Sequence, residues 1–262
     1  MSYIGNRDYW LEHAKKVVLA TYGDSISYDS KNKDLLKFGR NKLVQTTKST
    51  IMTLPTGIYN ETYVSTNIIN SIISTSAADT QIVTVEGHTI SGGVFTFVTQ
   101  NITLTGQTVV ALTTALARVS RVFNIGSTDL AGTISVTETD TYAAGVPNTA
   151  AGVHLQVDAG VNNSEKAATT ISNTDYWIVT SFYGDCLEKT ATFGIIHLEV
   201  RTAGGVFINK VDISANDSNR GEHEFKPHLI IPKNADVRLR ASASANNKDF
   251  SGGLQGILAS VV

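Results

Sequence analysis

Cysteine and proline are scarce in this sequence. Cys186 is the only cysteine among 262 residues, and there are four prolines. A single thiol forms neither an intrachain disulfide nor a thiolate metal cluster, and we expect Cys186 to be a small buried side chain near a strand end. A chain of this length, folded as one unit, buries roughly 70 to 75% of its unfolded surface. The fold can therefore be stabilised by its own hydrophobic core.

Charge is also sparse, and it is balanced. Charged residues make up 17% of the chain, with 21 Lys and Arg against 23 Asp and Glu. This balance gives no electrostatic basis for a nucleic-acid or membrane-surface partner. Small and polar residues dominate instead, a composition that suits both proteins buried in assemblies and secreted β-proteins. We take assembly as the leading interpretation.

Long hydrophobic runs are missing. No apolar run approaches the roughly 20 residues that span a bilayer, and residues 1–7 lack the basic start and apolar stretch of a signal peptide. We predict a chain that is made and used without a secretion signal.

Enzyme motifs are missing too. The sequence contains no HExxH, GxSxG, P-loop or GxGxxG pattern, and its glycine pairs fall in predicted hairpins and not before helices. No carboxylate pair stands out as the acid and base of a glycoside hydrolase, although the fold decides which carboxylates meet. We predict no catalytic residue, no cofactor and no enzymatic activity.

Two polar clusters raise the question of a metal ion. His223 and His228 flank Glu224, but no third ligand is evident. The other histidines show no ligand spacing: His13, His88, His154 and His197. One polar loop could offer oxygens to calcium, although its spacing is not that of an EF-hand. Its members are Asp212, Asp217, Asn219 and Glu222, with Arg220 among them. We predict solvated turns and no metal site.

Some aromatic side chains could stack on sugars, but they are scattered along the chain. They are Tyr59, Tyr63, Tyr142 and Phe250. Their spacing does not favour a carbohydrate site over ordinary core or rim positions.

Residues 174–262 parse as consecutive strands separated by turns. Aromatic and β-branched residues fill 176–183, and apolar side chains alternate with polar ones in 193–201. A glycine turn at 202–205 predicts a hairpin. Further strands are expected at 206–213, 228–231, 236–241 and 254–262, with a polar loop at 214–224. Such spacing without a helical period predicts an antiparallel β-sandwich or jelly roll.

The clearest helix lies at the N-terminus. Asn6 or Asp8 can cap a helix that runs to about Ala20. One stripe of this helix is apolar and consists of Trp10, Ala14, Val17 and Val18. The helix could pack onto the chain's own sheet or dock on a neighbouring subunit as an arm.

The segment 22–62 is poorly patterned and positive. Its basic residues are Lys31, Lys33, Lys37, Arg40, Lys42 and Lys48. Interleaved aromatics and a recognisable module, which nucleic-acid binding would call for, are not present. An extended arm lying across an acidic neighbour and a solvated loop both explain the charge. Arg238 and Arg240, which project from one face of a predicted strand, are similarly either rim contacts or solvated arginines.

A second β-rich unit is predicted between 66 and 136, followed by a weakly periodic connection at 137–173. We expect an N-terminal helix and extended arm in 1–64 and a jelly-roll or sandwich region in 65–262. That region can be divided further into 65–140 and 141–262.

Two groups of motifs resemble minor virion proteins of tailed bacteriophages. The first contains Thr103-Leu104-Thr105-Gly106, Arg118-Val119-Ser120-Arg121 and Gly132-Thr133-Ile134. The second runs from 198 to 256 and includes 223–232, 236–241 and 251–256. Together they cover roughly the last two thirds of the chain.

The resemblance implies a β-sandwich or jelly-roll component of the virion, often trimeric, with a structural role and no active site. It implies assembly in the host cytoplasm and a place in the phage head or neck. The leading hypothesis is a cement or decoration protein that binds the major capsid protein and bridges capsomers. The alternative is a tail, neck or fibre β-domain that binds partner proteins or host glycans.

Overall fold

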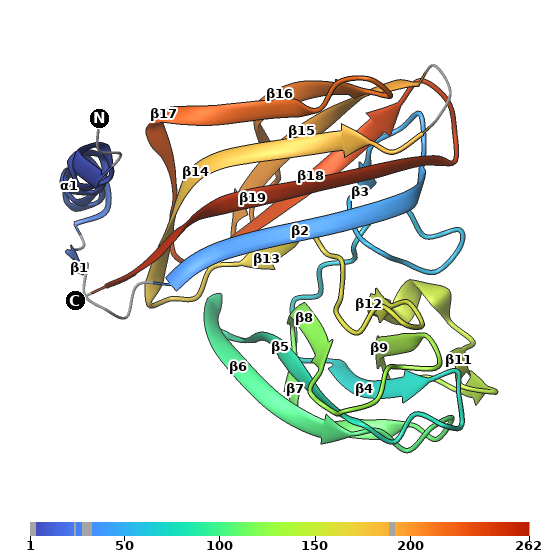
Figure 1. The fold of residues 1–262 in the computed structure, drawn as a ribbon. Helices are drawn as coiled ribbons and strands as arrows, with labels where there is room; N and C mark the ends of the chain where they lie inside the picture. The colour runs from blue at the N-terminus through green and yellow to red at the C-terminus, as the bar shows by residue number, and fades with distance from the viewer. Residues whose placement is uncertain (1–3, 24, 28–32, 189–191, 262) are drawn as a thin grey trace.

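Antiparallel β-strands make up most of the structure (Figure 1). The computed structural model describes residues 4–23, 25–27, 33–188 and 192–261. The described chain begins with the helix α1 (Ile4–Tyr22). The expected fold class, a mainly β protein with a short N-terminal helix, is confirmed.

Two sheets face each other as a sandwich. The first contains β2 (Lys33–Val44), β19 (Lys248–Val261), β14 (Asp175–Cys186) and β17 (Gly221–Ile231), with β1 (Ile26–Ser27) beside the end of β19. The second contains β13 (Ala168–Thr170), β18 (Ala235–Ala243), β15 (Phe193–Thr202) and β16 (Ile208–Asn216), with β3 (Ser49–Thr50) also beside β18.

The strands are paired in the order of a jelly roll. β2 pairs with the last strand β19, β13 with β18, β14 with β17, and β15 with β16, all antiparallel. The chain therefore runs as one long hairpin whose successive pairs fall alternately in the two sheets, which is the jelly-roll connectivity. The hairpin predicted at 202–205 is confirmed as the β15–β16 connection.

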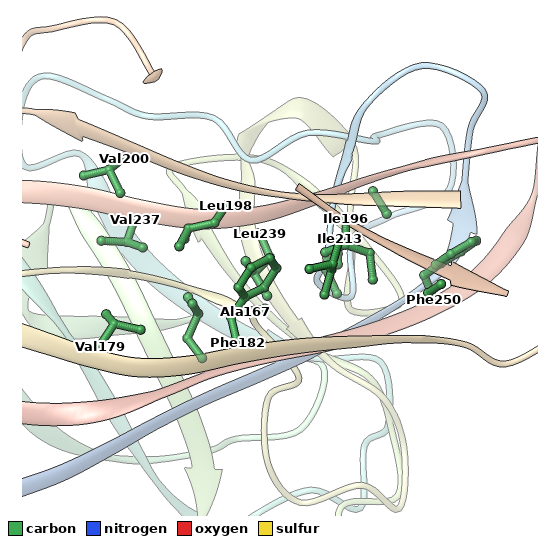
Figure 2. Close-up of a cluster of buried hydrophobic side chains, with 14 of the residues drawn as sticks. Ala167, Val179, Phe182, Ile196, Leu198, Val200, Ile213, Val237, Leu239 and Phe250 are labelled. Carbon is green, nitrogen blue, oxygen red and sulfur yellow. The ribbon is translucent and has the colours of Figure 1, made fainter. Parts of the chain in front are cut away.

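The main core lies between the two sheets (Figure 2). Val179 and Phe182 from β14 meet Ile196 and Leu198 from β15, as the alternation in 193–201 predicted. Cys186 is buried in the same core at the end of β14, which confirms its expected position.

Helix α1 packs on the outer face of the first sheet at one end, where β14 begins and β19 approaches its end (Figure 1). Ala14 and Val18 pack against Tyr176, Ile178 and Ala259. β14 is consequently buried on both faces at residues 176–179, and this explains why its sequence is a continuous apolar run there. Of the two positions considered for the helix, the structure shows packing on the chain's own sheet.

Residues 53–166 lie between β3 and β13 in the chain and form sheets of their own; we call them the insert. One sheet contains β12 (Val153–Val157), β9 (Ile134–Glu138), β4 (Ile69–Ser74) and β7 (Val110–Leu116). The other contains β6 (Val94–Thr103), β5 (Ile82–Ser91) and β8 (Arg118–Asn124). A small hairpin of β10 (Tyr142–Ala143) and β11 (Val146–Pro147) and a 3₁₀ turn at Ala150–Gly152 complete it. A separate apolar cluster that includes Ile72, Val85 and Val136 fills its interior.

The segment predicted as an extended arm contains a long strand. β2 pairs with β19 from Lys248 to Leu258. Gly39 permits this path, because a Cβ there would meet the Ile51 carbonyl oxygen at 2.2 Å and the Ala167 amide nitrogen at 2.3 Å. β2 can therefore pass close to the edge of the opposite sheet only with glycine at this position.

Three further expectations differ from the structure. The polar loop predicted at 214–224 is shorter, because β16 ends at Asn216 and β17 begins at Gly221. The helix begins at Ile4, so Asn6 and Asp8 lie inside it and do not cap it. The boundary expected at 140/141 falls between β9 and β12, which pair in one sheet.

Candidate functional site

The side chains of the two polar clusters considered for a metal ion contact other partners. The His223 ring packs edge-on against Phe225, with 4.7 Å between ring centroids, and Glu224 forms an ion pair with Lys226. His228 Nδ1 lies 3.0 Å from the Phe225 carbonyl oxygen. In the part of the chain that the structure describes, no three His, Cys, Asp or Glu side chains are grouped to hold a metal ion. The Asp212 carboxylate instead lies 2.7 Å from His197 Nδ1.

Three basic residues of the predicted arm form ion pairs with acidic residues of this chain. Arg40 pairs with Asp249 at 2.6 Å and Lys42 with Asp158 at 2.9 Å. Lys48 pairs with Glu199 at 3.0 Å. The acidic neighbour that the sequence suggested is thus within the same molecule. Lys31 and the side chain of Lys33 lie outside the described residues.

Arg238 and Arg240 are largely buried, with side-chain exposures of 12% and 17%, and so are not solvated arginines. Arg238 donates to Glu199 Oε2 at 2.8 Å, and Arg240 Nη1 lies 3.7 Å from the same oxygen. Burial alone would raise the pKa of Glu199, but hydrogen bonds from Lys48 and Arg238 outweigh burial and lower that pKa. On the outer face of the second sheet, the Glu199 carboxylate is therefore shared by three cations.

The scattered aromatics do not form a groove. Phe250 belongs to the sandwich core, and the Tyr142 hydroxyl lies 3.0 Å from Thr137 Oγ1. Tyr59 is half-buried, with its carbonyl accepting from the Thr50 amide. Tyr63 packs at the junction between insert and sandwich.

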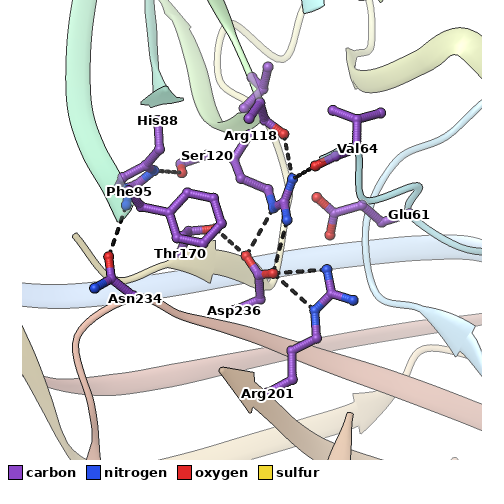
Figure 3. Close-up of polar contacts among 12 residues, drawn as sticks. Glu61, Val64, His88, Phe95, Arg118, Ser120, Thr170, Arg201, Asn234 and Asp236 are labelled. Atoms are coloured by element: carbon purple, nitrogen blue, oxygen red, sulfur yellow. Dashed lines mark hydrogen bonds and ion pairs between the residues drawn. The ribbon is translucent and has the colours of Figure 1, made fainter. Parts of the chain in front are cut away.

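A buried ion network centred on Asp236 joins the insert to the sandwich (Figure 3). Asp236, on β18, is fully buried. Arg118 from β8 donates to its two oxygens at 3.0 and 3.1 Å, Arg201 from β15 donates at 3.0 Å, and Thr170 donates at 2.6 Å. Burial raises the pKa of Asp236, but the hydrogen bond and charge of Arg118 outweigh it and lower that pKa. The carboxylate is therefore ionised and fully engaged.

Aromatic rings complete this junction. The Arg118 and Arg201 guanidinium carbons lie 4.9 and 4.4 Å from the Tyr63 ring centroid. Arg238 lies 3.7 Å from the centroid of Phe207. Ring faces attract cations. The Tyr63 and Phe207 rings therefore stabilise guanidinium charge that the single Asp236 carboxylate does not neutralise.

A second buried ion pair closes the base of the insert. Lys166 pairs with Glu61 and also donates to the Val119 carbonyl, and both side chains are buried. Met52 and Lys166 form a backbone bridge beside it. These contacts hold together the two segments that connect the sandwich to the insert, one at Met52 and one at Lys166. Sequence reasoning missed both ion pairs, because the partners are more than 100 residues apart.

A cleft opens where the sheet of β6, β5 and β8 faces the end of the sandwich. It has two adjoining parts of about 830 and 550 Å³, which share lining residues from β2, β5 and β8. Burial lowers the pKa of Lys37 to about 8, and the nearby Glu86 offsets this only in part. Burial also lowers the pKa of His88 to about 3, so its imidazole is neutral at pH 7. The sequence carried no signal for this cleft, since distant strands form it.

Comparisons with known proteins identify no family. No protein-family model matches the sequence, and no curated protein matches it. Among solved structures, similar chains come from infectious bursal disease virus. One, from the Gt strain, has 15% identity and a TM-score of 0.21 over 95% of this chain and 77% of that chain. Another, from the T13 viral particle, has 10% identity and a TM-score of 0.22 over 96% and 76% of the two chains. A third, from the VP2 subviral particle, has 11% identity and a TM-score of 0.20 over 95% and 78%.

These neighbours are viral capsid proteins. TM-scores near 0.2 are too low to establish a common fold. In the described ranges, no helix has the length and apolarity that crossing a bilayer demands.

Proposed function

We propose that this chain is a structural protein of a tailed-phage virion, specifically a cement or decoration protein that binds the major capsid protein and bridges neighbouring capsomers. The motifs at 103–106, 118–121 and 132–134 support this through their resemblance to minor virion proteins. The jelly-roll strand order is compatible with such a role, although a fold alone does not define a function.

The single observation that best supports bridging is the buried ion network at the junction between insert and sandwich. A protein that bridges two capsomers must resist bending between its two binding surfaces. Hinge motion would reduce the binding free energy gained when the second capsomer is contacted at the same time as the first. Arg118 of the insert fixes the two β units to each other by donating to both Asp236 oxygens at 3.0 and 3.1 Å in a buried site. We propose these units as the domains of the chain, with a jelly roll at 33–52 and 167–261 and the insert at 53–166.

The edge of the second sheet offers a contact surface. Phe193 and Ile195 at one end of the β15–β16 hairpin are exposed, as are Val206 and Ile208 at the other end. β16 is an edge strand, and exposed apolar side chains at a sheet edge favour association. We propose that this hairpin contacts virion proteins or neighbouring copies in a homotrimer.

The proposed protein would stabilise the capsid by thermodynamic linkage, because its binding favours the assembled shell. A protein that binds only the assembled shell stabilises it by about 2.7 kcal/mol when present at 100 times its dissociation constant. A specific contact needs on the order of 1,000 Å² of buried surface. The N-terminal helix is already packed on its own sheet, so the proposed contact comes from the β15–β16 hairpin.

The test begins with the mass of the protein in solution by light scattering, followed by binding to capsids depleted of this protein. We expect a compact trimer that binds capsids saturably. Phe193→Ser, at a side chain with 67% exposure, should weaken capsid binding, whereas Phe97→Ser in the cleft should not. A wild-type protein that ignores capsids but adheres to host cells would contradict the proposal and favour the tail or fibre alternative.

A further inference from the structure

The cleft between the insert and the sandwich presents an ordered row of polar side chains. In the register of the three-stranded sheet, Glu86 on β5 stands opposite Thr99 on β6 and opposite Arg121 on β8. All three line the larger part of the cleft. An acceptor, a hydroxyl and a cation therefore stand side by side across the sheet.

Lys37 is a buried polar group in the lining of both parts of the cleft. It is 8% exposed, and its ammonium lies 3.4 Å from the Ser120 carbonyl oxygen, a long hydrogen bond. An ammonium has three donors, so this contact leaves capacity for acceptors entering the cleft. Burying such a group is costly unless it finds partners.

The charges along the cleft are close to balance. Its lining contains three cations, Lys37, Arg121 and Lys166, and four carboxylates. The carboxylates are those of Asp34, Glu86, Glu165 and Asp175. Such a surface does not select an anion or a cation, but it offers donors and acceptors in alternation.

Two exposed aromatic faces accompany the polar row. Phe97 is 48% exposed and lines the larger part of the cleft, and Phe38 is 38% exposed and lines the smaller part. The Phe97 ring rests edge-on against His88, with 5.3 Å between ring centroids. This contact holds the phenyl ring at the opening while leaving much of its surface accessible.

We propose that this cleft binds a neutral oligosaccharide. Sugar hydroxyls both donate and accept hydrogen bonds, which matches the Thr99, Glu86 and Arg121 row, and the C–H face of a pyranose packs on an aromatic ring such as Phe97. The volume of the larger part, about 830 Å³, is that of a small-molecule site. This binding activity goes beyond the proposed structural role and holds wherever in the virion the protein resides.

The experiment probes the full-length protein against a printed array of neutral and acidic glycans, followed by titration calorimetry with the neutral glycan that binds best. We expect neutral glycans to bind. Glu86→Gln removes a charged acceptor and should weaken binding on the order of tenfold. Phe97→Ala removes the stacking face and should weaken it to a similar extent. Phe193→Ala, at an exposed phenylalanine outside the cleft, is the matched control and should bind as the wild type does.

Failure has clear forms. Absence of binding across the array, binding of acidic glycans alone, or equal affinity in Phe97→Ala and wild type would each overturn the proposal. Thermal melting of every variant separates a lost site from a lost fold, and Glu86→Gln provides a second test if Phe97→Ala is unstable. Capsid binding by Phe97→Ala should remain normal, so the structural role and the glycan site are tested independently.

Discussion

Replacing Asp236 by asparagine should destabilise the protein more than removing any of its surface ion pairs. The substitution keeps the shape of the side chain but leaves Arg118 and Arg201 without their shared anion in a site where Asp236 is fully buried. Breaking a buried pair by removing one partner costs about 3–5 kcal/mol. We therefore expect the free energy of unfolding to fall by about 3–5 kcal/mol and the melting temperature to fall by roughly 10 °C.

The matched control is Asp158→Asn. The Lys42–Asp158 pair has a similar distance, 2.9 Å, but the two side chains are 56% and 32% exposed. Exposed pairs contribute about 0–1 kcal/mol. Urea unfolding curves for wild type and both variants measure the difference. If Asp236→Asn cost no more than Asp158→Asn, the buried network would not be holding the insert to the sandwich.

The same substitution has a pH signature. The pKa of Asp236 is lowered in the folded protein because Arg118 and Arg201 outweigh its burial. Its contribution to stability is therefore present above the ordinary aspartate pKa and is lost as pH falls through the lower, folded-state pKa. Below about pH 4 the wild type should lose stability more steeply than Asp236→Asn. Parallel acid profiles of the two proteins would contradict the assignment.

Three other substitutions test different parts of the structure. Gly39→Ala should cost about 1–3 kcal/mol or more in urea unfolding, because its Cβ would clash with the backbone of Ile51 and Ala167; a wild-type value would show that β2 does not pass so close. Burial lowers the His88 pKa to about 3, so between about pH 3 and 6.5 the unfolded chain binds more protons than the folded protein, and wild-type stability rises with pH. His88→Gln should flatten this pH dependence of stability. An unchanged stability profile would argue against the burial of His88. Lys37→Met should raise the melting temperature at pH 7, since it removes a buried ammonium whose pKa is lowered to about 8, and should weaken glycan binding; a lower melting temperature would contradict the cost assigned to Lys37.

The C-terminal strands were predictable because their patterns are local. The alternation of Ile196, Leu198 and Val200 with polar residues identified β15 and its buried face, and all three side chains are in the core. The polar face was not predicted to be buried, yet His197 and Glu199 are buried there. Their ion-pair and hydrogen-bond partners are distant in sequence or on other strands, so alternation alone could not reveal them.

β2 was missed because its pattern is inverted. Leu36 and Phe38 face outward and are exposed, whereas Lys37, Gly39 and Asn41 point inward and are buried. Asn41 is satisfied there by donating to the Thr50 carbonyl at 2.7 Å. These three inward-facing residues of β2 are polar or glycine and are buried by the insert and the opposite sheet. The sequence of β2 therefore shows no alternation of apolar residues on its buried face.

The candidate site was beyond sequence reasoning for a related reason. The insert begins and ends where Met52 and Lys166 meet, and the cleft forms only when β5 and β8 are brought against β2 by that closure. Isolated residues such as Glu86 and Phe97 carry no motif. What could be predicted was the β class, since it depends on composition and short-range pattern.

The most direct test of the structural role is the melting of capsids measured by calorimetry, with and without the purified protein at saturating concentration. If the chain bridges capsomers, the wild type should raise the capsid melting temperature and Phe193→Ser should raise it less. An unchanged melting temperature at concentrations where the protein is intact and trimeric would contradict the cement function.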